Sequence, residues 1–244
     1  MDIKIIKTLL TELSSVGISQ VIIDPTEEGS MFRGTNDDRT LIVYNEVGEK
    51  LADMPIGIKN VNAILSRINL FDEDKAKIEL VETNDGYCGD FIVKQGRKRV
   101  SYRCHEPITK YIQAPTTIPG DLSITDENQI KFDKEYVTYL SNAFSAMAYT
   151  GDKQERTISV EVSEGSATIS IFDGSDDTFV DVVEGINDSL SLKGLFDVAP
   201  FSRVMKQSVN SESNDGYSVF TMTEQGVGIF KLEYMDILVH PTVS

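Results

Sequence analysis

Few residues of this chain have the type and spacing that catalysis or metal binding requires. The sequence contains two histidines, His105 and His240, and two cysteines, Cys88 and Cys104. Cys104 and His105 are adjacent, and neighbours at the end of a strand point to opposite faces, so they cannot share one ligand. We interpret Cys104 as a buried structural cysteine beside an exposed histidine. Two cysteines form no disulfide framework, which favours a reducing compartment; they could pair only on adjacent strands.

Two further segments have only a partial likeness to ligand-binding motifs. Residues 173–177, DGSDD, are acidic like a calcium loop but lack its ligand order and its distal Glu, which favours a solvated turn. The segment 226–228, GVG, has no third glycine and lies between expected strands, which favours a turn over a phosphate-binding loop. The sequence also has no Walker motif and no Gly-x-Ser-x-Gly elbow. We therefore predict that the protein is not an enzyme and holds no cofactor or metal.

Charge concentrates in two strand-like segments of opposite sign. Residues 95–103, QGRKRVSYR, form the most basic stretch, and residues 173–184, DGSDDTFVDVVE, form the most acidic one. Charged edge strands ordinarily prevent unwanted pairing, which is one interpretation. Opposite charges on two edges also suit a head-to-tail contact, which closes into a ring when the rotation per subunit divides evenly into a circle. The predicted subunit interface comprises Arg97, Lys98, Arg99, Val100, Arg103, Asp177, Phe179, Asp181 and Val182.

The elements that must position these residues follow from hydrophobic periodicity. Apolar residues at helical spacing predict four helices. Most of the remaining chain alternates apolar and polar residues, which predicts antiparallel sheets with one wet face. The expected helices span residues 2–15, 59–70, 133–149 and 197–209. Examples of the expected strands are residues 20–24, 39–44, 77–82, 157–162, 167–172, 178–184 and 228–234.

Composition places the chain among soluble globular proteins. Its 244 residues are 40% hydrophobic and 25% charged, which excludes disordered, collagen-like and disulfide-scaffold classes. The net charge of −16 argues, taken as a bulk value, against nucleic-acid binding. No stretch approaches the ~18 apolar residues of a membrane span, and the amino terminus lacks the apolar block of a signal peptide. We expect a cytoplasmic protein with no membrane partner.

The expected helices differ in charge from the rest of the chain. The segments 2–15, 58–70, 133–149 and 196–209 hold seven basic and five acidic residues, a net of +2, whereas the remainder carries −18. Solvated lysines on ordinary amphipathic helices would explain any single segment. A segregation over four helices favours a shared cationic face. Its residues are Lys4, Lys7, Lys59, Arg67, Lys134, Arg203 and Lys206, with Asn62, Asn69 and Gln207 as weaker candidates.

Internal similarity suggests that one unit occurs twice. The tetrapeptide Asn-Asp-Gly-Tyr occurs at residues 84–87 and again at 214–217, and the first and third expected helices begin at Asp2 and Asp133. Chance recurrence of a common turn sequence is the alternative. With helices at nearly the same offset, duplication is the better account. We expect an amino-terminal domain over 1–106, a Pro-containing connector over 107–129 and a carboxyl-terminal domain over 130–244.

A duplicated unit of two helices and antiparallel strands, with an acidic body and basic helices, resembles a DNA sliding clamp. The similarity is greatest to the clamps of tailed bacteriophages and extends more distantly to PCNA. The segments that carry it run from Gly57 to Leu80 and from Leu190 to Pro241. The resemblance implies an α+β clamp fold of two domains, with antiparallel sheets outside and helices lining a homotrimeric ring around duplex DNA. It also implies a clamp-loader ATPase that opens the ring and a DNA polymerase that docks near the connector.

The function expected from this resemblance is to hold a replicative polymerase on its template, without reading base sequence, in the host-cell cytoplasm if the protein is viral. The cationic face would contact DNA. The polymerase peptide would bind an apolar groove formed by Tyr111, Ile112, Pro115, Ile118, Leu238 and Pro241, although core strands would have a similar sequence. Two alternatives remain. One is an acidic, β-rich viral structural or assembly protein that encircles no DNA, and the other is a monomeric hydrolase-like domain with an unrecognised site.

Overall fold

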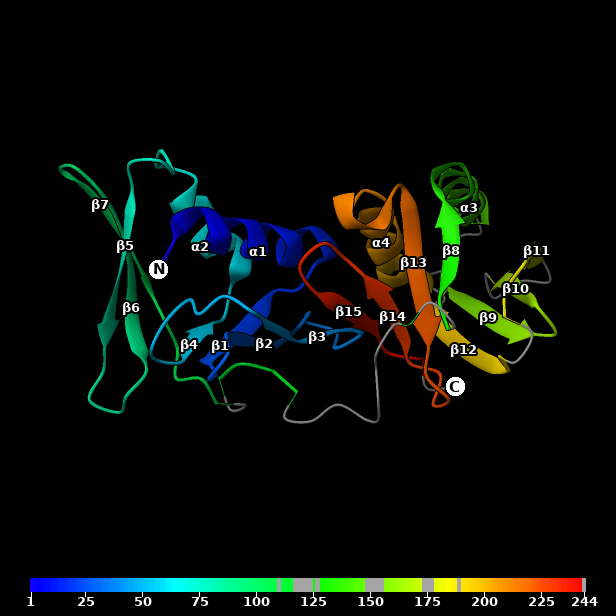
Figure 1. The fold of residues 1–244 in the computed structure, drawn as a ribbon, viewed down its shortest axis with the longest axis horizontal. Coiled ribbons are helices and arrows are strands. Elements are labelled where there is room, and N and C mark those ends of the chain that lie inside the picture. The colour runs from blue at the N-terminus through cyan, green and yellow to red at the C-terminus, as the bar shows by residue number, and fades with distance from the viewer. Residues whose placement is uncertain are drawn as a thin grey trace. The chain divides into compact units, whose positions relative to one another are not determined.

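The structure is a computed structural model that describes residues 1–108, 111–115, 125, 128–147, 156–172, 178–187 and 190–242. By its internal contacts the chain divides into two compact units, residues 1–118 (unit 1) and 119–244 (unit 2). Figure 1 draws unit 1 from blue to green and unit 2 from green to red. Two residues named above, Ile118 and Asp177, lie outside the described part of the chain.

The described residues of unit 1 form two helices and seven strands. Strand β1 pairs with β2 and β4, and β2 pairs with β3, while β5, β6 and β7 form a separate sheet, all antiparallel. In Figure 1, α1 and α2 lie together on one side of β1–β4. The elements in chain order are α1 (Ile3–Val16), β1 (Gln20–Pro25), β2 (Ser30–Thr35), β3 (Leu41–Val47), β4 (Ile56–Ile58), α2 (Val61–Ile68), β5 (Lys77–Glu82), β6 (Cys88–Gln95) and β7 (Lys98–Arg103).

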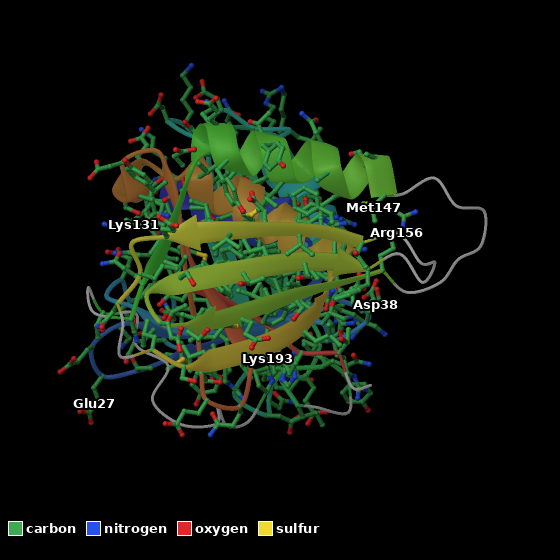
Figure 2. All side chains as sticks on the ribbon, turned by 90° about the vertical axis from the view of Figure 1, so that its right-hand side faces the viewer. Glu27, Asp38, Lys131, Met147, Arg156 and Lys193 are labelled. Atoms are coloured by element: carbon green, nitrogen blue, oxygen red, sulfur yellow. The ribbon has the colours of Figure 1, made fainter. Side chains whose placement is uncertain are left out.

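Unit 2 repeats this arrangement after one additional strand. Strand β9 pairs with β10 and β12, β10 pairs with β11, and β13 pairs with β8 and β14, which in turn pairs with β15. Figure 2 looks onto the sheet of β9–β12, with Lys193 of β12 near its lower edge and α3 above. The elements are β8 (Ile130–Asp133), α3 (Lys134–Ala146), β9 (Thr157–Ser163), β10 (Ser166–Phe172), β11 (Thr178–Glu184), β12 (Leu192–Asp197), α4 (Val198–Val209), the 3-10 turn η2 (Glu212–Asn214), β13 (Tyr217–Met222), β14 (Gly228–Lys231) and β15 (Asp236–Val239).

The duplication predicted from the sequence is present, but one of the arguments for it was wrong. The order helix, four strands, helix, three strands occurs in both units, and the sheet order β4-β1-β2-β3 is matched by β12-β9-β10-β11. The two Asn-Asp-Gly-Tyr sequences are not equivalent, because residues 84–87 join β5 to β6 whereas residues 214–217 lie after α4 and include the first residue of β13. The counterpart of the β5–β6 turn is 223–227, and both turns close with the same backbone hydrogen bonds (83 N to 87 O, 223 N to 227 O).

All four predicted helices form, because each begins at a side chain that caps it. The first backbone N–H groups of a helix have no intrahelical partner, and Asp or Asn at the N-cap accepts from them. Asp2, Asn60, Asp133 and Asp197 do so, at 2.7, 2.8, 2.7 and 3.1 Å. Helix α1 ends at Gly17, whose φ of 95° is the left-handed conformation that glycine adopts without strain.

The two cores differ in side-chain type. In unit 1, α1 buries aliphatic side chains, including the fully covered Ile6, Leu10 and Leu13. In unit 2, Phe196, Phe201, Phe220 and Phe230 form a continuous aromatic cluster with ring centroids 4.7–6.2 Å apart. Such edge-to-face and tilted pairs stabilise a core beyond simple area burial.

The predicted alternation of buried and exposed residues is confirmed in β9, β10 and β11 but fails in β1 and β13. In β13, five consecutive residues are buried, so both faces of this strand are covered. The expected strand over 228–234 is also shorter than predicted. It ends at Lys231, because Leu232 N donates to Met235 O at 3.0 Å and closes a turn.

Candidate functional site

The outward sides of the helices carry almost no negative charge. Glu12 is the sole acidic residue within α1 and α2, and it is only 7% exposed. Within α3 and α4, Glu135 is the sole acidic residue. The N-cap aspartates direct a carboxylate oxygen to their own helix backbone. The exposed side chains of α1 and α2 are otherwise lysine and neutral hydrogen-bonding groups, namely Lys4, Thr8, Thr11, Ser15, Asn62 and Ser66.

Two of the predicted cations on α1 are engaged by the loop after α2. Lys4 Nζ lies 2.6 Å from Asp74 Oδ1, and Lys7 Nζ lies 3.2 Å from Glu73 Oε2. The hydrogen bond and charge of Asp74 raise the pKa of Lys4 above its ordinary value, so this lysine stays protonated. Both lysines are therefore cationic but already paired within the protein.

Arg67 of α2 is also held by protein groups. Its Nη1 donates to Ala63 O at 2.6 Å and its Nε to Ser101 O of β7 at 3.2 Å. The guanidinium lies 5.3 Å from the centre of the Tyr102 ring, within the range of a cation–π contact. Lys59 precedes α2 and is exposed. In unit 1, three of the four predicted cations thus have protein partners.

The three predicted cations of unit 2 behave differently. Lys134, Arg203 and Lys206 are exposed, and the charged group of each forms no ion pair or hydrogen bond with another residue that the structure describes. Among the weaker candidates, Asn62 accepts a hydrogen bond from Ser14 and so joins α2 to α1. Asn69 is exposed and Gln207 is half-buried.

The basic segment forms an edge strand. Strand β7 pairs only with β6 in its described sheet, which leaves its other side open. Lys98 and Arg99 on it, and Arg97 before it, are exposed, and Val100 is half-buried. Arg103 reaches back to Asp90, with Nη1 3.1 Å from Oδ2.

The acidic segment is likewise an edge strand. Strand β11 pairs only with β10 in its described sheet. Val182 is 51% exposed and Val180, which the sequence analysis did not single out, is 60% exposed. Phe179 contacts Tyr139 of α3 with ring centroids 5.7 Å apart, and Asp181 lies near the Tyr136 hydroxyl and raises its pKa together with burial. The open edge of β11 therefore combines exposed valines with acidic side chains.

Unit 1 has a pocket of about 280 Å³ beside the start of the predicted connector. The segment is held on the sheet, because Gln113 N donates to Gln20 Oε1 at 3.1 Å and Arg33 Nη1 donates to Pro115 O at 3.3 Å. Arg39 Nε donates to Gln113 Oε1 at 2.9 Å across one side. Because the lining mixes apolar surface with the Arg39 cation, the pocket suits a short peptide segment. The lining residues are Thr35, Arg39, Ile42, Gln113, Ala114 and Pro115.

The residues predicted for the partner-peptide groove fall in different environments. Pro115 lines the pocket, Tyr111 is 42% exposed, and Pro241 is half-buried. Ile112 and Leu238 are 0% and 3% exposed, so they belong to the cores of their units and offer no surface to a peptide. Ile112 packs beside Gly57, where an added Cβ would lie 2.3 Å from the backbone oxygen of His105 and 2.7 Å from Ile112 Cδ1.

Sequence reasoning missed two features of this surface. Thr35 and Arg39 of the pocket lie more than seventy residues before Gln113 in the chain, and these residues carry no motif. The acidic run at residues 72–74 was visible, but its pairing with lysines nearly seventy residues earlier was not. No local signal in the sequence indicates this pairing, because it depends on how the loop after α2 folds back onto α1.

Cys88, the first residue of β6, and Cys104, directly after the adjacent strand β7, lie close together in unit 1. Cys104 N donates to Gly89 O at 2.9 Å, and both thiols are free and buried. Among the described residues, no group of His, Cys, Asp and Glu side chains could hold a metal ion, and no described helix has the length and apolar character to cross a membrane.

No protein-family model and no curated protein matches the sequence. The fold, in contrast, matches solved structures over the full chain. A structure of A. fulgidus PCNA bound to the C-terminal region of FEN-1 is 14% identical, with a TM-score of 0.61, and the match covers 100% of this chain and 97% of that one. Entamoeba histolytica PCNA is 14% identical over 97% and 94% of the two chains, with a TM-score of 0.63.

A longer bacterial protein has the same fold. The DNA polymerase sliding clamp of Pseudomonas aeruginosa is 12% identical, with a TM-score of 0.67, and the match covers 100% of this chain and 66% of that one. In the described residues, this chain has two helices and antiparallel sheets in each of its two units, as predicted from the sequence. The chain therefore has the fold of the PCNA-like clamp superfamily.

Proposed function

We propose that the protein is a sliding clamp: copies of the chain form a closed ring, the helices face a duplex that passes through it, and a DNA polymerase is tethered to the outside. The observation that carries the proposal is the charge of the helices. In a chain of net charge −16, the four helices hold six basic side chains and two acidic ones, of which Glu12 is buried. Such a cationic face on an anionic body suits contact with DNA on this face alone.

The ring would close through the two open edges. Strand β7 supplies exposed basic side chains, and β11 supplies acidic side chains with exposed valines. Pairing them adds backbone hydrogen bonds between copies and is heterologous, so it generates a ring if the rotation closes. Cross-strand ion pairs contribute only about 0.2–1 kcal/mol each, so Val100, Phe179, Val180 and Val182 would supply most of the affinity. The resemblance favours three copies.

The mechanism would be topological. A closed ring cannot leave DNA sideways, so it can stay bound without tight phosphate contact. Weak contact is an advantage, because each phosphate neutralised contributes about 0.9 to the slope of log affinity against log salt and would retard sliding. Exposed lysine, arginine, serine, threonine and asparagine side chains can contact the backbone without reading bases.

The pocket beside residues 113–115 would receive a short segment of the polymerase, with apolar residues on Ile42 and Pro115 and an acidic residue near Arg39. Tyr111, which is also in unit 1, is a further candidate for this contact. A ring that must admit a circular template needs an opening enzyme, and a clamp-loader ATPase is the proposed partner for this step.

Retention on DNA with blocked ends tests the central proposal. The protein is threaded onto a linear duplex with open ends, both ends are then blocked by a bulky protein, and the half-life of the complex is measured after dilution. We expect retention many times longer than on the same duplex with open ends. Cutting off one block with a restriction enzyme should release the protein. Equal half-lives on blocked and open DNA would falsify the topological mechanism.

The matched control is a variant that cannot close the ring. Arg97→Glu with Arg99→Glu reverses the charge of the β7 edge but leaves the helices unchanged. It should bind both substrates briefly and to the same extent. A variant with wild-type retention would show that the ring closes through other surfaces.

A further inference from the structure

The loop after α2 pairs with the two lysines of α1 in a way that bears on DNA contact. Resting on the proposed function, we propose that Glu73 and Asp74 set the strength of DNA contact by competing with DNA phosphates for Lys7 and Lys4. The carboxylates of Glu73 and Asp74 then occupy the positions on the two lysines that DNA phosphates would otherwise occupy. The loop keeps the α1 lysines charged and correctly placed, but withholds most of their contribution to DNA affinity.

The loop is ordered in the position that this competition requires. Asp72 N donates to Gln95 Oε1 at 3.1 Å, and Ala76 N donates to Asp72 O at 2.9 Å. Phe71, immediately before the loop, is buried. The carboxylates of Glu73 and Asp74 are therefore presented from a hydrogen-bonded turn.

The two ion pairs are also accessible enough to exchange. The side chains of Lys4 and Asp74 are 55% and 71% exposed, and those of Lys7 and Glu73 are 33% and 44% exposed. Exposed ion pairs contribute only about 0–1 kcal/mol. A phosphate arriving at this face can therefore replace either carboxylate without disturbing the fold.

The corresponding connection in unit 2 makes no such contact. Residues 210–216 join α4 to β13 and contain Glu212 and Asp215. Neither carboxylate forms an ion pair with Lys134, Arg203 or Lys206 within the part of the chain that the structure describes. Within the described residues, pairing of the proposed DNA-facing lysines with carboxylates of the following loop is thus found in unit 1 and not in unit 2.

The salt dependence of DNA binding should reveal the difference. The measured quantity is the slope of log binding affinity against log salt concentration. A free lysine that neutralises a phosphate releases condensed counterions and adds about 0.9 to the size of this slope. A lysine that must first leave its carboxylate partner adds less to the slope, because the freed carboxylate binds a cation from solution and so offsets the counterion released from DNA. Most of the slope in the wild-type protein should therefore come from unit 2 and Lys59.

A mutant cycle measures this directly on the full chain. Glu73→Gln with Asp74→Asn should steepen the slope by up to about 1.8, twice the single-phosphate value. Adding Lys4→Gln and Lys7→Gln to that variant should remove the gain. The same lysine substitutions in the wild-type protein should change the slope by much less.

The control variant makes an equal change of net charge and also frees two lysines, but away from the helices. Asp53 pairs with Lys50 at 2.9 Å, and Glu161 pairs with Lys193 at 2.8 Å on the sheet seen in Figure 2. Asp53→Asn with Glu161→Gln should leave the slope close to that of the wild-type protein. A slope as steep as that of the loop variant would attribute the effect to net charge and overturn the proposal.

Two other results would also overturn it: a loop variant with wild-type slope, or lysine substitutions that lower the slope equally in both backgrounds. Failure of the proposed function looks different. In that case retention would not depend on blocked ends, and Arg203→Gln with Lys206→Gln would leave DNA binding unchanged. If those two tests succeed and the loop variant has no effect, only the role of Glu73 and Asp74 is lost.

Discussion

The two units of this chain have the same fold but present different chemistry at corresponding places. On the helices, unit 1 pairs Lys4 and Lys7 with carboxylates and packs Arg67 against Tyr102, whereas the cations of unit 2 have no such partners among the described residues. At the sheet edges, unit 1 offers the basic β7 and unit 2 the acidic β11.

Whether a helix cation is free to contact a ligand is therefore decided by residues outside that helix. The loop after α2 and the strand β7 determine what the unit 1 cations can do. The helices themselves have similar capping and similar numbers of basic residues in both units. Equivalent positions in a duplicated fold therefore need not contribute equally to one function.

The largest expected effect concerns the two edges. In the proposed ring, Arg97→Glu with Arg99→Glu would place like charges opposite the acidic β11, which costs several kcal/mol, and should raise the dissociation constant of the assembly by two or more orders of magnitude. Sedimentation velocity at micromolar concentration should then show monomers. Asp181→Lys in the same chain should restore part of the assembly. If the Arg97→Glu, Arg99→Glu variant formed an assembly of unchanged mass, the opposite charges of β7 and β11 would not be what holds the subunits together.

An intermediate effect separates a structural arginine from an exposed one. Arg67→Ala removes two hydrogen bonds from a charged donor and a contact with Tyr102, so the free energy of unfolding should fall by about 1–3 kcal/mol. The salt slope of DNA binding should hardly change. Arg203→Ala should do the reverse, with a slope lower by about 0.9 and unchanged stability.

Chemical denaturation and binding titrations on the same two proteins check both parts of this prediction. If Arg67→Ala lowered the slope as much as Arg203→Ala, the helices of the two units would be equivalent in DNA contact.

The smallest effect concerns the strands β15 and β7, which occupy corresponding places. The first residue of β15 is the acidic Asp236, whereas the first residue of β7 is the basic Lys98. Burial raises the pKa of the Asp236 carboxyl, and the Lys231 ammonium opposes this only in part. The folded state therefore favours the protonated form, and this penalty on stability is present at pH 7 and disappears as the pH falls toward the unfolded value of about 3.9.

Asp236→Asn should accordingly raise the melting temperature at pH 7 by about 2–4 °C, the shift that corresponds to roughly 1 kcal/mol in a chain of this size. The two proteins should melt together near pH 4. Differential scanning calorimetry between pH 4 and 8 measures this. A gap that persists at pH 4 would indicate a packing effect.

The sequence was sufficient to predict the helices and the fold class, because their signals are local. N-cap aspartates, apolar residues at helical spacing and strand alternation act over a few residues, and each helix was found to within about two residues at its beginning. The duplication was also correct in outline. The tetrapeptide at residues 84–87 and 214–217 misled, because a common turn sequence can arise at unrelated positions.

The candidate site was less predictable, because its properties depend on contacts between distant residues. The types of Lys4 and Arg67 indicate cations, but nothing local reveals that Asp74 and Ser101 are their partners. Ile112 is apolar, as expected of a groove residue, but it lies in the core, because its side chain packs beside Gly57, which is more than fifty residues earlier in the chain. The two charged segments were correctly predicted to be edge strands, β7 and β11. The exposure of Val180 on β11 was not predicted, because its neighbours in the sequence are mainly acidic.

The capped beginnings of the helices have a consequence for motion along DNA. An uncapped helix start presents free N–H groups and a partial positive charge, which is a ready place for a phosphate to settle. In this protein each such place is already occupied by an aspartate or asparagine side chain. If a duplex passes these helices as proposed, its phosphates would meet side chains and no free helix N-terminus, so no single position along the helices would hold a phosphate more strongly by this means.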